Sequence, residues 1–522
     1  MKTQYPRIAE TSLEAGALCV HNRGRDALYL AVLSLTGALG ILYQRAALIF
    51  VAAVLGLSLF WWITVRLRRM GLEIWQSLLL MTLSCYMLLN YGFENITIHV
   101  GGIPLIVSYA LMYMSFALAV YSSRHWIVRA LTEPAMLCLL ALLLFSVLHL
   151  FVDVPSYGLW AVRDSTMILD GLFVVLGLLW AREANSITVL IKWLMLITVI
   201  NLFYCFTFPW SAKLLAWSPT SGVFMDVPIL GQYHTTDLYL LQGTVLCLGL
   251  GGYMVTRRRW IMLLLVVAQL FGLAIVQARA AYVALAAFIV ILTLLGEARK
   301  SGILVAMLFS ALAVLVLVTS VGGLQLSGRI GPVNIGFLAD HLRSITGVKV
   351  TAASTVQSRF DWTGEAMDHF RSSPIVGVGF GQPLINYIDE ETGAVVRIPH
   401  NSNITILARL GVIGFAIWAI FHLWLIQRFI YAYSHRRRTD KQVYELILWI
   451  FLFYINFMVS SLVEAPFEFP SSAIPFYFFM GLGLGLIRWQ LPGESKATQP
   501  LRSIVAGRHP VVIDGRHSGF VT

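Results

Sequence analysis

Residues 134–152 read PAMLCLLALLLFSVLHLFV and contain no aspartate, glutamate, lysine or arginine. A helix needs roughly 17–25 apolar residues to cross the ~30 Å hydrocarbon core of a bilayer. This stretch is long enough, and similar runs recur along the chain between short polar gaps. The pattern predicts an all-α polytopic membrane protein.

Composition supports the same class. Hydrophobic residues make up 58% of the 522 residues and charged residues only 12%, with a mean hydropathy of +0.78, whereas a soluble domain carries about 25% charged residues. The five cysteines are scattered without a C-x-x-C spacing, which argues against a disulfide framework and thiolate metal sites. The net charge of +11 falls mostly in gaps and in the tail, so we interpret it as topological and expect no nucleic-acid partner.

The apolar runs predict about 14 transmembrane helices, within a range of about 12–14. We place them at residues 27–44, 46–64, 74–93, 103–122, 134–152, 165–181, 187–208, 238–256, 260–277, 280–296, 302–321, 411–432, 442–463 and 472–490. The expected organisation is a cytoplasmic segment 1–26, helices 1–11 over 27–321, a large loop with short helices over 322–410, helices 12–14 over 411–490, and a cytoplasmic tail 491–522.

Basic residues fix the expected orientation. Every basic cluster follows an even-numbered span: 66–69, 124–129, 182, 257–259, 299–300 and 436–441. By the positive-inside rule, both termini then lie in the cytoplasm and the gaps after odd-numbered spans lie outside. The external gaps include the turn at 278–279, the loop 322–410 and residues 464–471.

The loop 322–410 is the one long polar segment before the tail, and we expect it to contribute the active-site residues. Within it, residues 357–371 have the spacing of an amphipathic helix that Pro374 ends. Residues 377–381 read GVGFG; we favour a tightly turned loop over a phosphate-binding loop, because the required strand and helix context is missing. The run 389–391 reads DEE, and three consecutive carboxylates do not converge on one ion, so we predict no metal site.

Two basic positions stand out on the external side. His400-Asn401-Ser402-Asn403 carries good N-cap residues, so a helix is expected to start there, with an N-terminus suited to a phosphate group. Nearby arginines and the helix dipole disfavour imidazolium, so His400 is either a proton acceptor or a capping residue at the surface. Arg279 lies between two apolar runs, either as a snorkelling side chain or as an anion clamp.

Other external polar residues are weaker candidates. Each is more often a cap, a paired charge or a loop residue than a functional group: His234, Asp237, Asp170, Glu464 and Glu468.

Three motifs resemble the O-antigen ligase/polymerase family. They are Gln277-Ala278-Arg279-Ala280-Ala281, then Ser358-Arg359-Phe360-Asp361-Trp362 with residues 373–379, and Pro399-His400-Asn401 with residues 407–414. Their order, spacing and external location fit over about residues 270–430. Two positions depart from the pattern: Ala278 stands where many relatives have serine, and Arg409 where many have an acidic residue.

The resemblance implies a GT-C-like glycosyltransferase of the bacterial inner membrane, acting in lipopolysaccharide or exopolysaccharide synthesis with its site facing the periplasm. It implies His400 as the catalytic residue and Arg279 and Arg359 as ligands of the pyrophosphate. Possible supporting residues are Asn401, Arg409, His234 and Asp237. The implied partners are a polyprenyl-pyrophosphate-linked glycan donor, an acceptor glycan or lipid A core, and membrane lipid.

Fixed guanidinium groups could replace a metal ion at the leaving pyrophosphate, so we expect metal-independent transfer without a cofactor. The alternative is a lipid-linked glycan flippase or secondary transporter, which the number of spans also suits. Transporters usually place their polar sites near mid-membrane, whereas the polar residues here gather outside, which favours the transferase. A scaffold that recruits a partner through its basic tail has no positive support.

Overall fold

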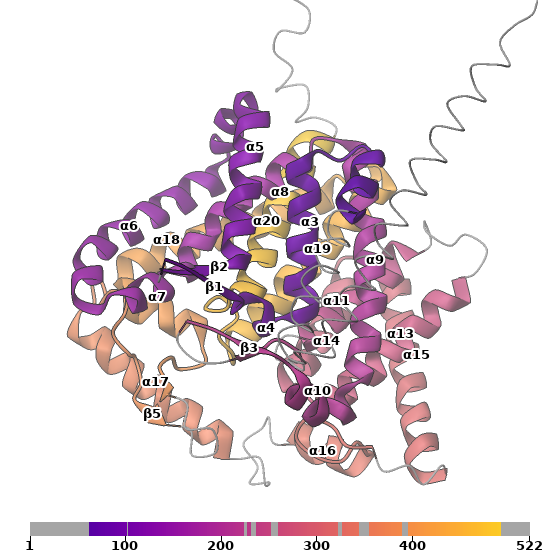
Figure 1. Ribbon diagram of the computed structural model, residues 1–522. Coiled ribbons are helices and arrows are strands. Elements are labelled where there is room, and N and C mark those ends of the chain that lie inside the picture. The colour runs from indigo at the N-terminus through magenta and orange to yellow at the C-terminus, as the bar shows by residue number, and fades with distance from the viewer. Residues whose placement is uncertain are drawn as a thin grey trace, which may run out of the picture. The chain divides into compact units, whose positions relative to one another are not determined.

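Helices in the computed structural model follow most of the apolar runs (Figure 1). The structure describes residues 62–101, 103–223, 227–230, 236–251, 259–321, 326–343, 354–388 and 395–491. The chain divides into two units, Met1–Leu72 and Glu73–Thr522. The described part of the first unit contains a helix at residues 62–69, and every element named below belongs to the second unit.

Seven helices among the described residues are long and apolar enough to cross a membrane. They are α6 (Pro134–Tyr157), α9 (Ala184–Phe206), α13 (Arg259–Val276), α15 (Ala298–Val316, continued by the π-helical turn η3, Leu317–Val321), α18 (Ser402–Ser434), α19 (Lys441–Ser461) and α20 (Pro470–Gln490). Three shorter apolar helices are α3 (Ile74–Leu89), α11 (Thr236–Gly249) and α14 (Arg279–Leu294). The chain is therefore a mainly helical, multi-pass membrane protein, as predicted.

The count of about 14 spans and the GT-C-like arrangement stay predictions. The predicted spans 27–44 and most of 46–64 lie outside the described residues, as does the tail after residue 491. The domain boundaries proposed above likewise stay predictions.

Helix α20 is the most deeply buried of the long helices and packs along α8 (Val174–Trp180). A Cβ atom at Gly177 would collide with the carbonyl oxygen of Phe478, and one at Gly481 with that of Val174. Small residues that let two backbones approach closely are a common device of membrane helix packing. The lack of a side chain at Gly177 and Gly481 therefore allows the backbones of α8 and α20 to pack closely.

The other helices pack in pairs. Helix α11 lies against α13 and α19, α3 against α5 (Val107–Leu131), and α6 along α18 and α7 (Leu159–Leu169). Short elements connect them: α4 (Tyr91–Glu94), η1 (Asp170–Phe173), η2 (Phe208–Trp210), α10 (Ser211–Trp217), the antiparallel pair β3 (Thr220–Ser221) with β4 (Val227–Pro228), and η5 (Arg436–Arg438).

Among the described residues, the predicted spans 103–122 and 165–181 differ most from the structure. The run predicted at 103–122 begins instead as the hairpin of β1 (Thr97–Val100) and β2 (Ile103–Ile106), and its helix, α5, is displaced toward Leu131. Alternating β-branched residues around the Gly101 turn favour strands locally. The run predicted at 165–181 is split into α7, η1 and α8 at Asp170-Gly171, where glycine weakens a helix.

The external loop contains two helices and a short hairpin. These are α16 (Ile335–Arg343), α17 (Ser354–Ser372) and the antiparallel pair β5 (Tyr387–Ile388) with β6 (Val395–Val396). Helix α17 includes the predicted 357–371 segment and ends just before Pro374. Ala366 on α17 packs with Leu384 and with Ala408 on α18, which joins the loop to the helical bundle.

Candidate functional site

Helix α18 begins where the sequence predicted. Asn401 is its N-cap, and the Asn401 side chain accepts a hydrogen bond from the amide of Ile404 at 3.2 Å. His400 lies immediately before this cap with a φ of 49°, a conformation that non-glycine residues adopt at a cost. The strained backbone fixes the imidazole at the start of the helix.

The predicted site residues meet around Glu464, which lies between α19 and α20. Nη2 of Arg359 is 2.8 Å from Oε1 of Glu464, and Nδ1 of His400 is 3.5 Å from its Oε2. Arg279, the first residue of α14, interacts electrostatically with both Arg359 and Glu464. Side chains from α14, α17, α18 and the α19–α20 connection thus form one basic cluster.

The cluster extends to two further charges. Arg329 acts electrostatically on Glu464 and on Asp237, which is buried in the first turn of α11. Three arginines therefore face two carboxylates, and the residual charge is positive. A cluster with excess guanidinium charge is suited to binding an anion such as a phosphate.

Glu464 is ionised in this setting. Partial removal from water would by itself raise the pKa of its carboxyl group, but the contact with His400 and the positive charges of Arg359 and Arg329 lower that pKa to about 2. The carboxylate is therefore charged at neutral pH. Its contact with Nδ1 of His400 favours the tautomer with the proton on that nitrogen, in which Nε2 is unprotonated.

A clamped turn carries Arg279. The side chain of Gln277 accepts hydrogen bonds from the amides of Ile330 (2.7 Å) and Gly331 (3.0 Å). His341 on α16 contacts the Gln277 carbonyl oxygen at 2.8 Å. Gln277 itself is buried and has a φ of 54°. Residues of the loop after α15 thus hold the turn between α13 and α14 in place, and this turn positions Arg279.

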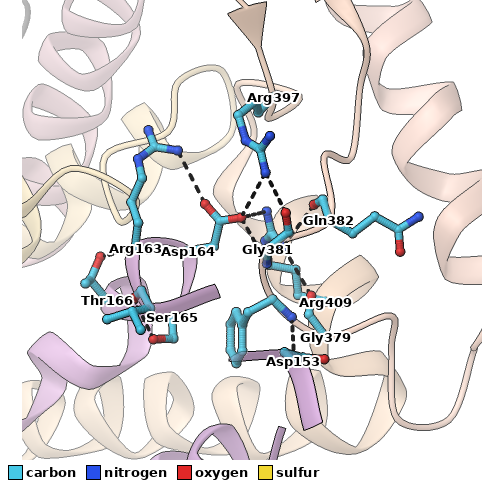
Figure 2. Close-up of polar contacts among 12 residues, drawn as sticks. Asp153, Arg163, Asp164, Ser165, Thr166, Gly379, Gly381, Gln382, Arg397 and Arg409 are labelled. Atoms are coloured by element: carbon cyan, nitrogen blue, oxygen red, sulfur yellow. Dashed lines mark hydrogen bonds and ion pairs between the residues drawn. The ribbon is translucent and has the colours of Figure 1, made fainter. Parts of the chain in front are cut away.

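A second network of polar contacts holds the glycine loop, residues 377–381 (Figure 2). Arg409 on α18 is 1% exposed; its Nη2 is 2.7 Å from Oδ2 of Asp164 on α7, and its Nη1 donates to the carbonyl oxygen of Gly379 at 3.1 Å. Arg397 donates to the carbonyl oxygen of Gly381. The network connects α7, the glycine loop and α18.

The glycine loop is tightly turned, as predicted. Gly377, Gly379 and Gly381 all have φ between 78° and 92°. The amide of Phe380 donates to Asp153 at 2.7 Å, and the amide of Gly381 donates to Asp164 at 3.2 Å. The two carboxylates therefore already accept hydrogen bonds from the backbone amides that a phosphate-binding loop would donate to its ligand.

The remaining candidates lie in different places. His234 and the run 389–391 are outside the described residues. Asp170 is buried in the bundle, where it accepts a hydrogen bond from Tyr109. Glu468 accepts a 2.5 Å hydrogen bond from Ser402 and so supports the start of α18. Glu464 was ranked among the weak candidates; its only sequence signal was its place beside Pro466 after an apolar run.

One comparison with known proteins found a match. A family model described as O-antigen ligase matches residues 243–419, about a third of the chain, which include Arg279, Arg359 and His400. No curated protein is similar enough to count as a match. The match confirms the predicted resemblance: residues 243–419 are similar to the O-antigen ligase family.

Proposed function

We propose that the protein transfers a glycan from a polyprenyl pyrophosphate to the hydroxyl group of an acceptor sugar. The observation that carries the proposal is the convergence of Arg279, Arg359 and His400 on Glu464. We place the reaction at the periplasmic face of the bacterial inner membrane, with both termini in the cytoplasm, because the basic gaps lie on the opposite side.

Arg279 and Arg359 bind the pyrophosphate. A guanidinium group presents several N–H donors in a planar fork that matches phosphate oxygens. Arg359 already pairs with a carboxylate, Glu464, which marks a position where an anion is favourable. The two positive charges stabilise the charge that develops on the leaving group, so we expect transfer without a metal ion.

His400 removes the proton of the acceptor. The acceptor oxygen bonds to the anomeric carbon while the bond from that carbon to the phosphate oxygen breaks. The electron pair of that bond leaves with polyprenyl pyrophosphate, and the hydroxyl proton passes to Nε2 of His400. Glu464, on the Nδ1 side, orients the ring and stabilises its protonated form. A single displacement inverts the anomeric carbon.

Replacing Arg279 with lysine tests the pyrophosphate clamp. Lysine keeps the charge but loses the planar fork, so we expect transfer to fall by roughly 10²-fold, as for loss of one charge-stabilising donor. The measurement is glycan transfer by purified protein in lipid nanodiscs, together with the carrier-linked glycan in cells. The glycan should accumulate on the outer face of the membrane. A normal rate of transfer would exclude Arg279 as a ligand of the pyrophosphate. Accumulation of the carrier-linked glycan on the inner face would indicate a flippase.

Replacing Gln277 with alanine tests how Arg279 is positioned. The change removes the acceptor of the Ile330 and Gly331 amides, at a net cost of ~0.5–1.5 kcal/mol for each hydrogen bond, and frees the turn that carries Arg279. We expect the KM for the lipid-linked donor to rise about tenfold. Gln269→Ala is the matched control, because Gln269 is equally buried on α13 but bonds to Leu265 and Cys247 instead. Equal changes in KM in both variants would contradict a positioning role.

A further inference from the structure

We propose that Trp362 and Tyr387 form a platform that binds the acceptor glycan through a neutral sugar ring beside His400. The proposal rests on the proposed function, because it places the second substrate of the same reaction. It assigns the two substrates to two chemically different surfaces.

The imidazole of His400 has unlike neighbours on its two sides. Its Nδ1 atom lies 3.5 Å from Oε2 of Glu464, the carboxylate that also pairs with Arg359. Its ring also packs against the indole of Trp362, with 5.5 Å between ring centroids and a tilt of 36°. Because the pyrophosphate occupies the arginine side, the acceptor hydroxyl reaches His400 from the aromatic side.

The platform is preformed. The rings of Trp362, on α17, and Tyr387, in β5, lie 5.3 Å apart between centroids. Tyr387 pairs with Val396 of β6, and the next residue back, Asn386, donates its amide to Glu365 on α17 at 3.3 Å. A surface held in place before binding loses less conformational entropy when the ligand arrives.

The chemistry of the surface favours a sugar over a phosphate. Tyr387 is 38% exposed, so a ligand can reach its ring. The face of an aromatic ring carries partial negative charge and attracts the C–H groups of an apolar sugar face. Two exposed carboxylates on α17, Asp361 and Glu365, lie one residue before and three residues after Trp362. Carboxylates accept hydrogen bonds from sugar hydroxyls and repel phosphate.

The test uses two probes that report on the two surfaces separately. One is dephosphorylated oligosaccharide released from the surface polysaccharide of the producing organism; the other is geranylgeranyl pyrophosphate. Both are titrated by calorimetry into the full-length protein in nanodiscs. Trp362→Ala is expected to weaken oligosaccharide binding about tenfold and to change pyrophosphate binding less than about twofold. Trp362→Phe, which keeps an aromatic face, should recover most of the affinity.

Two further variants complete the design. Trp217→Ala removes an indole that is 82% exposed on α10 and should leave oligosaccharide affinity unchanged. Arg279→Ala should lose the pyrophosphate probe and keep the oligosaccharide. Unchanged oligosaccharide affinity in Trp362→Ala, or no oligosaccharide binding by the unmodified protein, overturns the platform. Normal pyrophosphate binding in Arg279→Ala overturns the proposed function instead, so the two failures are distinguishable.

Discussion

Replacing His400 with alanine is expected to reduce glycan transfer by roughly 10²–10⁴-fold, the usual contribution of a general base. The variant loses the only proton acceptor that we assign to the acceptor hydroxyl. It keeps the helix start, since the Asn401 cap bonds to Ile404 without involving His400. Pyrophosphate binding should change little, because Arg279 and Arg359 remain. The measurement is the rate of transfer by purified protein at saturating donor and acceptor.

The matched control is His99→Ala, which removes an exposed histidine from strand β1. This variant should transfer glycan at the normal rate. Activity of His400→Ala close to that of His99→Ala, with the protein folded, would exclude His400 as the base. Inactivity combined with loss of geranylgeranyl pyrophosphate binding would point to a collapsed site rather than to a missing base.

Replacing Arg409 with methionine is expected to lower the free energy of unfolding by ~3–5 kcal/mol. Arg409 and Asp164 are 1% and 3% exposed at their side chains and lie 2.7 Å apart. The methionine variant leaves the buried carboxylate of Asp164 without its closest partner and the carbonyl oxygen of Gly379 without its donor. Unfolding in denaturant, followed by tryptophan fluorescence in detergent micelles, measures the loss.

Two companion variants show whether the buried charge is the cause. Adding Asp164→Asn to Arg409→Met removes the unpaired charge, so the double variant should recover part of the lost stability. Arg371→Met breaks an exposed pair with Asp368, whose side chains are 70% and 72% exposed, and should cost ~0–1 kcal/mol. Equal losses for Arg409→Met and Arg371→Met would contradict a structural role for the buried pair.

Local signals in the sequence were sufficient to predict part of the site. The Asn401 cap, the amphipathic spacing of residues 357–371 and the turn after Val276 all depend on neighbours a few residues away, and the structure has each of them. The motifs around Arg279, Arg359 and His400 carried the resemblance, and the O-antigen ligase match covers all three.

Other parts of the site depend on residues far apart in the chain. Glu464 lies 105 residues after Arg359, and no local pattern shows that the two side chains meet. The resemblance predicts Arg409 as a possible supporting residue of the site, and that role stays a prediction. In the structure its side chain contacts Asp164, 245 residues earlier. A helical period tells which residues share a face, but not which helix that face meets.

The sequence by itself determined the class of the protein. Long apolar runs cannot remain in water, and a backbone in lipid must satisfy its own hydrogen bonds, so a bundle of membrane helices follows from composition and spacing. The tertiary structure decided the assembly of the site. It brought Glu464 to His400, joined Arg409 to Asp164, and set Trp362 against the imidazole of His400, because those contacts depend on how distant helices pack.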